Sequence, residues 1–211
     1  MRAANVPVPQ LPVVQAWRAG SVAVINDVYG AVQTWIAGLP ASPIRDFLHQ
    51  GVVSVRATAL SVVGIRVGAT PSCVSTGNCS GQDFSGQDLT MIYAQKVNFS
   101  YANFTDANLN DANLADSNLT GAYLTDASVK EANLSNVNLT DAKLSSASLI
   151  SANLTRAILT RANLTDAILI SANLTNANLT NASLTSAKLN GAIWYQTTCP
   201  NGTVTDTGCK T

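Results

Sequence analysis

The sequence is poor in charged residues and holds a single histidine. Of its 211 residues 11% are charged, and twelve acidic side chains balance twelve basic ones. Net charge therefore gives no reason to expect a nucleic acid or an anionic membrane as a partner. The histidine is His49, and no Gly-X-Ser-X-Gly motif accompanies it, which argues against a serine hydrolase. We expect a protein that is not an enzyme and that needs no cofactor, metal or small-molecule ligand.

Long apolar runs are also absent. Asp27, Pro40, Pro43 and Arg45 interrupt every stretch that approaches the twenty or so residues of a membrane-spanning helix. No uninterrupted apolar core follows Arg2, as a secretory signal peptide would require. The sequence therefore predicts no transmembrane segment, and it leaves the route of any export open.

A repeat of five residues runs from Asp83 to Trp194 without an insertion. Leu or Phe stands at nearly every fifth position from Phe84 to Leu189, and an alanine usually precedes it by two residues. A helix needs a period near 3.6 and a strand needs 2, so neither fits. A period of five fits a chain that turns a corner every five residues and buries the same two positions on each side of a coil.

Four such sides make a coil of twenty residues, so residues twenty apart should stack at about the ~4.8 Å spacing of neighbouring strands. The recurring Ala-Asn-Leu triplet, as in residues 107–109 and 132–134, resembles the motif of the pentapeptide-repeat family. That resemblance implies an all-β solenoid, a right-handed quadrilateral β-helix. A charge on its axis, as in Leu139→Asp, should not be tolerated.

The rest of the chain divides into three flanking parts. Residues 1–67 are expected to hold a proline-rich arm and a helical hairpin, with helices over 14–39 and from Ser42 to Val62. The β-branched run over 52–67 leaves a strand open for the second half of the hairpin. Residues 68–82 should form a cysteine-containing linker. Residues 195–211 should form a loop that covers the last coil of the repeat at 83–194.

The hairpin carries a second resemblance. The string from Val32 to Pro40, followed by Pro43-Ile44, by Asp46-Phe47-Leu48 and by Val55-Arg56, resembles a segment of exported envelope proteins of acid-fast bacteria. The match is partial, because Ser42 and Ala57 replace the Asn and the second Arg of that pattern. This resemblance implies a location rather than an activity.

Four cysteines flank the repeat as two local pairs, Cys73 with Cys79 and Cys199 with Cys209. Metal binding favours histidine or a tighter Cys-X2-Cys spacing, so we expect two short-loop disulfides, with free thiols as the alternative. Disulfides indicate an oxidising compartment. The predicted location is therefore extracellular or in the cell envelope, with the cytoplasm as the alternative.

Several polar columns follow from the twenty-residue spacing. Asp106 should stack under Asp126, and Asp111 under Glu131; such pairs could bind a cation, but solvated surface charge is the simpler interpretation. Asp141 and Arg161 share another column and should form an ion pair on the surface. The asparagine column should form side-chain ladders or turn hydrogen bonds; its members are Asn113, Asn133, Asn153 and Asn173.

Three isoleucines stand where serine or threonine is usual. Ile150, Ile168 and Ile170 should lie on one side of neighbouring coils, and a contiguous exposed patch of isoleucine indicates a contact surface. The contact could be with a protein partner or a second copy of the chain. Alternatively, the N-terminal hairpin folds back over this face.

Two function classes remain. The first is a non-catalytic structural or protein-interaction module, exported or associated with the envelope. The second comes from the pentapeptide-repeat resemblance, since some members of that family imitate DNA with an acidic rod and protect DNA gyrase. Residues 83–194 hold nine acidic and six basic residues, a weak negative field for an imitation of DNA. The interaction module is therefore the favoured prediction.

Overall fold

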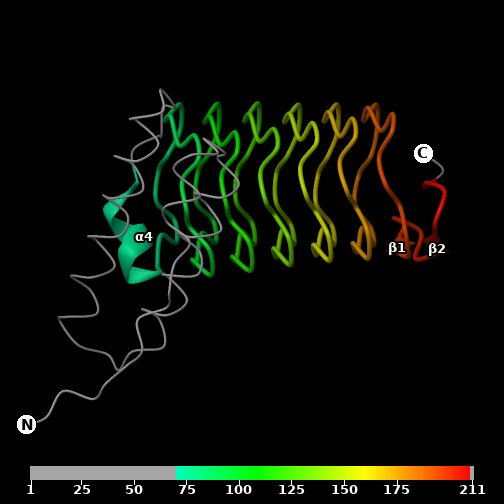
Figure 1. Ribbon diagram of the computed structural model, residues 1–211, viewed down its shortest axis with the longest axis horizontal. Coiled ribbons are helices and arrows are strands. Elements are labelled where there is room, and N and C mark those ends of the chain that lie inside the picture. Colours follow the sequence, from blue (N-terminus) through cyan, green and yellow to red (C-terminus); the bar gives the residue numbers. More distant parts are fainter. Residues whose placement is uncertain (1–69, 210–211) are drawn as a thin grey trace, which may run out of the picture. The chain divides into compact units, whose positions relative to one another are not determined.

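The computed structural model describes residues 70–209 of the chain, and Figure 1 traces them. The predicted arm and hairpin of residues 1–67, His49 and the segment that resembles envelope proteins lie outside the described residues.

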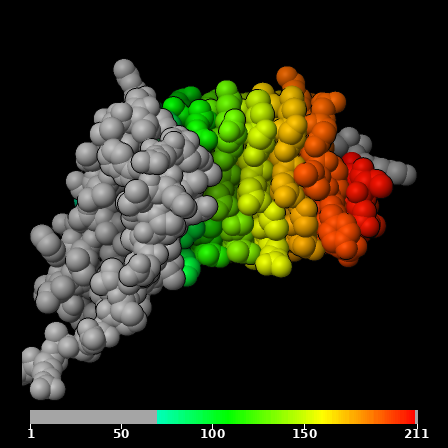
Figure 2. All heavy atoms as spheres, in the orientation of Figure 1, coloured from blue at the N-terminus to red at the C-terminus, as the bar shows by residue number. Residues whose placement is uncertain are grey.

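From Asn78 to Thr198 the chain winds into stacked turns of twenty residues. Parallel bridges join residues twenty apart along the whole stretch, from Asn78 with Asn98 to Asn178 with Thr198. One bridge falls in every five residues, as a four-sided coil requires. In Figure 1 the successive coils lie side by side, from green to orange, and Figure 2 shows the same order as successive bands of atoms. The right-handed sense stays a prediction.

The backbone of each coil is hydrogen-bonded to the coils before and after it. Leu139 N–H donates to the carbonyl of Ile158 at 2.7 Å, and Asn138 N–H donates to the carbonyl of Ser117 at 3.0 Å. The bridged stretch begins five residues before the expected start at Asp83 and ends four residues after Trp194. It is longer because Cys79 and Cys199 occupy axis positions that Leu or Phe fills elsewhere.

Every corner of the coil is a tight turn that contains a positive φ angle. At one of them Ala102 N–H donates to the carbonyl of Phe99 at 3.0 Å, and Tyr101 between them has a φ of 58°. A type II turn requires this conformation at its third residue. The sequence mostly supplies Gly, Asp, Asn or Ser at these corners and never Val, Ile or Thr, whose branched side chains suit a positive φ least.

The axis of the coil is a continuous apolar core. Leu139 and Ala142 are fully buried, as are nearly all their counterparts at five-residue spacing. Near the N-terminal end the rings of Phe84, Phe99 and Phe104 pack together, with Phe84 and Phe104 stacked at 5.0 Å between centroids. At roughly 1.5–3 kcal/mol for each buried leucine, this core is the main stabilising contribution.

Short elements flank the two ends of the repeat. Helix α4, Ser72–Thr76, precedes the first coil and ends at Gly77, whose φ is 74°. Strands β1, Thr197–Thr198, and β2, Val204–Thr205, pair antiparallel after the last coil.

The predicted C-terminal cover is only partial. Thr198 continues a bridge column through Asn178, so the β1–β2 pair extends one side of the coil. Along the next sides the core residues Ala187, Leu189 and Ala192 are only partly buried. Within residues 70–209, the N–H groups of Leu184 and Leu189 have no hydrogen-bond acceptor. The loop therefore leaves part of the last coil open.

Candidate functional site

The candidate site is one side of the coil, which we call the isoleucine face. Its outward positions are two columns of residues twenty apart, one through Ser148 and Ile168 and one through Ile150 and Ile170. Ser148 and Ile168 form a parallel bridge, and Leu149 N–H donates to the carbonyl of Ile168 at 2.7 Å. Ser151 N–H donates to the carbonyl of Ile170 at 2.9 Å, which places Ile150 and Ile170 on adjacent coils. The structure thus places all three isoleucines on one face.

These isoleucine side chains are half-buried, so less of their surface meets water than the sequence suggests. Beside them the hydroxyl oxygen of Ser148 is buried and, within residues 70–209, lacks a hydrogen-bond partner. A buried hydroxyl without a hydrogen-bond partner costs free energy. The most exposed isoleucines in the described chain, Ile158 and Ile193, were not singled out by sequence.

Acidic residues line both corners that border the isoleucine face. Within residues 70–209, these two corner columns hold five carboxylates and no basic side chain. Asp106, Asp126 and Asp166 stand in one column, and Asp111 and Glu131 stand in the other. Lys130 precedes Glu131 and occupies the same outward column as Ile150. The face therefore has an apolar centre with mainly acidic borders.

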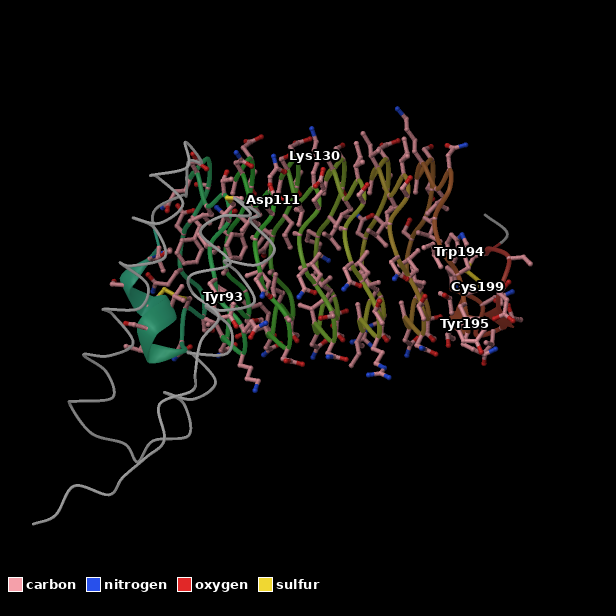
Figure 3. All side chains as sticks on the ribbon, viewed as in Figure 1. Tyr93, Asp111, Lys130, Trp194, Tyr195 and Cys199 are labelled. Carbon is pink, nitrogen blue, oxygen red and sulfur yellow. A yellow bond between two sulfur atoms is a disulfide. The ribbon has the colours of Figure 1, made fainter. Side chains whose placement is uncertain are left out.

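The predicted stacking of Asp111 and Glu131 has an electrostatic consequence. Asp111 N–H donates to the carbonyl of Lys130, and both residues are labelled in Figure 3. Since Glu131 follows Lys130, Asp111 and Glu131 lie on adjacent coils. Partial burial of Asp111 and, next to it, the negative charge of Glu131 raise the pKa of the Asp111 carboxyl above its ordinary value. Like charges at this spacing oppose each other.

The predicted ion pair between Asp141 and Arg161 is present. Arg161 donates from Nε to Oδ1 at 2.8 Å and from Nη2 to Oδ2 at 2.7 Å. The hydrogen bonds from Arg161 are the main reason that the pKa of Asp141 falls below its ordinary value. Both side chains are largely exposed, so solvent screens the pair and it contributes little to stability.

The asparagine columns form both kinds of hydrogen bond that the sequence predicts. Asn133 Nδ2 donates to Asn113 Oδ1 at 3.3 Å, and Asn153 Nδ2 donates to Asn133 Oδ1 at the same distance. Asn153 Oδ1 also accepts a hydrogen bond from the backbone N–H of Thr155 at 3.1 Å. These amides connect the coils along the stack and satisfy the backbone within each side.

Both local cysteine pairs are disulfides in the structure. The Cα atoms lie 5.2 Å apart in Cys73–Cys79 and 5.4 Å apart in Cys199–Cys209. Cys79 and Cys199 are buried, and they are the first and last members of the axis column that also holds Leu119. Each disulfide thus ties a flanking segment to one end of the core. The five-residue register of Cys79 and Cys199 could have revealed this role from sequence.

Within residues 70–209, no cluster of three or more His, Cys, Asp or Glu side chains could hold a metal ion. In the same range, no helix is long and apolar enough to cross a membrane.

The twenty-residue bridges, the buried Leu and Ala columns and the corner turns define a class of stacked-coil repeat proteins. Within that class the pentapeptide-repeat model matches residues 78–116, 117–156 and 157–193, more than half of the chain. The chain belongs to the pentapeptide-repeat family. Proteins of this family are generally non-catalytic.

Solved structures of other pentapeptide-repeat proteins resemble the chain. HetL, which is involved in regulation of heterocyst differentiation in the cyanobacterium Nostoc sp. strain PCC 7120, is 29% identical, with a TM-score of 0.42; the match covers 61% of this chain and 66% of HetL, just under two thirds of its length. The protein alr5209 from Nostoc PCC 7120 is 35% identical over 43% of this chain and 68% of its own, with a TM-score of 0.25.

A third similar structure is full-length QnrB1, a plasmid-mediated fluoroquinolone resistance protein. It is 15% identical over 55% of this chain and 90% of its own, with a TM-score of 0.22. All three TM-scores lie below 0.5. No curated protein sequence matches the chain.

Proposed function

We propose that the protein is a non-catalytic interaction module of the cell envelope or the extracellular space, and that it binds a protein partner through the isoleucine face. The observation that carries the proposal is the group Ile150, Ile168 and Ile170 on a surface that is otherwise mostly Ser, Thr and Asn. Burial of these side chains against a partner would add to affinity at up to roughly 1.5–3 kcal/mol each.

The borders of the face indicate what the partner surface carries. Asp126 and Glu131 lie on the coil that precedes Ile150, and Asp166 precedes Ile168 by two residues. These carboxylates favour lysine or arginine on the rim of the partner's surface. An apolar centre with a charged rim is the usual anatomy of a protein interface. We therefore expect a partner with an apolar patch inside a basic border.

The proposed location rests on the two disulfides and on the resemblance of the N-terminal segment to exported envelope proteins. Disulfides persist in oxidising compartments and are rare in the cytosol. A cytoplasmic location is the alternative.

The test of the isoleucine face is the triple change of Ile150, Ile168 and Ile170 to Thr. Thr occupies equivalent outward positions such as Thr155 and Thr175, so the coil should remain folded. A photoreactive amino acid at Ser148 should crosslink in vivo to one defined partner, and the triple variant should lose this adduct. The same photoreactive amino acid at Ile158 is the control and should not give the adduct. The change Ile158→Thr, which removes an exposed isoleucine from another side, should leave the adduct intact.

Three other outcomes would contradict this proposal. Loss of a dimer by light scattering would identify the partner as a second copy of the chain. Faster proteolysis of residues 1–70 in an unchanged monomer would show that the hairpin covers the face instead. No change in any of these measurements would leave the isoleucines without a binding role.

DNA imitation is a second candidate because five acidic residues line two neighbouring corners. Lys130 and Lys188 stand between those corners, and Arg156 and Arg161 occupy others, so the negative field is broken. We expect no change in DNA supercoiling by gyrase at stoichiometric concentrations of the protein. Clear inhibition or protection would favour DNA imitation over the proposed function.

A further inference from the structure

We propose that Tyr101, Gly121 and Tyr123, which we call the tyrosine platform, bind a neutral carbohydrate. The platform belongs to other sides of the coil than the isoleucine face, and the proposal does not depend on the partner proposed above. It differs from the expectation, drawn from the sequence, that the chain takes no small-molecule ligand.

The first observation is how Tyr101 is held. Tyr101 and Gly121 are corner residues on adjacent coils, and a Cβ added to Gly121 would lie 2.6 Å from Cε1 and 2.7 Å from Cδ1 of the Tyr101 ring. Only glycine leaves room for this ring position. Gly121 is buried beneath it, whereas Tyr101 is 64% exposed. The ring is therefore supported by the backbone on one side and open to solvent elsewhere.

Tyr123 adds a second aromatic surface two residues after Gly121. It is 48% exposed, and a parallel bridge with Asn103 fixes its backbone. Within residues 70–209, neither the Tyr101 nor the Tyr123 hydroxyl has a hydrogen-bond partner. By contrast, the Tyr93 hydroxyl donates to Gln95 Oε1 at 2.7 Å. The platform thus offers two ring surfaces and two unused hydroxyl groups.

Polar side chains flank the platform, from the column of Ser100 and from the column of Tyr123 itself. Ser100, next to Tyr101, has its hydroxyl 2.9 Å from that of Ser80. On the other side of Tyr101, Asn103 Nδ2 donates to Asp83 Oδ1 at 3.0 Å. Hydroxyl, amide and carboxylate oxygens are the groups that bind sugar hydroxyls.

The charges around the platform are mainly negative. Asp83 lies on its N-terminal side, and Asp106 and Asp126 occupy the next corner column, whereas Lys143 lies on its C-terminal side. Asp141 and Arg161 neutralise each other in a bidentate pair. A nucleic acid would stack on aromatic rings but needs a positively charged surface. A surface without excess positive charge disfavours anions, so we expect a neutral ligand.

The small apolar area favours a sugar over a protein. The other large apolar residues exposed within residues 70–209 belong to later coils or to the C-terminal segment: Ile158, Ile193, Tyr195 and Val204. A protein hot spot needs surrounding contacts that exclude water. A pyranose ring instead has one apolar C–H surface, which stacks on an aromatic ring, and a rim of hydroxyls. This pattern matches two tyrosines bordered by Ser, Asn and Asp.

The test is a titration of the full chain with neutral oligosaccharides of glucose, mannose and N-acetylglucosamine, followed by calorimetry and by NMR of the tyrosine rings. We expect at least one of these sugars to bind and to shift the Tyr101 and Tyr123 signals. Tyr101→Ala should weaken that binding about tenfold or more. Tyr195→Ala, which removes a tyrosine that is 58% exposed in the last coil, should leave the affinity unchanged.

Gly121→Asn is the sharper variant. Asn181 stands in the same corner column with a φ of 59°, so asparagine suits the backbone there and the fold should persist by circular dichroism. Its Cβ would displace the Tyr101 ring, so sugar binding should fall as in Tyr101→Ala. Failure of every sugar to bind, equal loss in Tyr195→Ala, or a protein crosslinked at Tyr101 would each overturn the proposal. None of these outcomes bears on the isoleucine face.

Discussion

Corner residues carry a conformational constraint that the sequence displays clearly. Positions such as Asp106, Asp126 and Asn136 have φ angles near 58°, and Gly, Asp, Asn and Ser fill most of their counterparts. These side chains tolerate a positive φ, and those of Asp and Asn hydrogen-bond locally in turns. Because the corner column is exposed, it also carries most of the charge of the coil. Backbone geometry therefore explains why carboxylates gather along corners.

The raised pKa of one corner carboxyl should be measurable as a pH-dependent change in stability. Asp111 has a raised pKa in the folded protein, mainly from partial burial and then from Glu131. The folded protein therefore binds a proton at a pH where the unfolded chain has released it. The contribution of Asp111 to the free energy of unfolding is therefore greatest below the ordinary carboxyl pKa and falls as the pH rises through the folded pKa.

We therefore expect Asp111→Asn to raise the free energy of unfolding at pH 7, by about 0.5 kcal/mol at this exposed position. The gain should vanish below the ordinary carboxyl pKa, where both states are protonated. Urea denaturation at several pH values measures it. The matched control is Asp166→Asn, because Ser146 and Ser186 are its neighbours in the column. A gain independent of pH, or equal in both variants, would rule out this explanation.

At the scale of the element, the five-residue side was the most predictable feature. The register of Leu139 and Ala142 specifies the buried positions, and the twenty-residue period specifies pairs such as Asp141 with Arg161. The end structures were less predictable. Cys79 extends the coil beyond the expected start, and helix α4 lies in a segment with no periodic signal. Short elements at chain ends depend on local contacts that a repeat pattern does not contain.

Stability should depend strongly on the axis and weakly on the outward columns. Leu139→Ala removes a fully buried side chain between two other leucines of its column and should cost about 2–5 kcal/mol. Ser135→Ala should change stability by about 0.5 kcal/mol or less, because Ala115 already stands in the same outward column. Chemical denaturation of both variants tests the difference.

A stronger version of this test replaces the same leucine by a charge. Leu139→Asp should abolish folding, since a carboxylate at the axis has no partner. A folded Leu139→Asp protein with normal denaturation would mean that the axis is not the core.

For the molecule as a whole, the sequence predicted the family and the placement of the isoleucines, but not how exposed they are. Ile150, Ile168 and Ile170 share a face because the period fixes the side on which each residue lies. Their partial burial depends on the packing of neighbouring side chains, which a period does not specify. The tyrosine platform was missed because its signal is a pair of residues twenty apart, Tyr101 and Gly121, rather than a motif along the chain.

The protein is proposed to act outside the cytoplasm, and cell fractionation combined with mass spectrometry of non-reduced peptides measures this location. We expect the protein in the envelope or extracellular fraction, with Cys73 linked to Cys79 and Cys199 linked to Cys209. Protein confined to the cytoplasm with four free thiols would show that the proposed location is wrong.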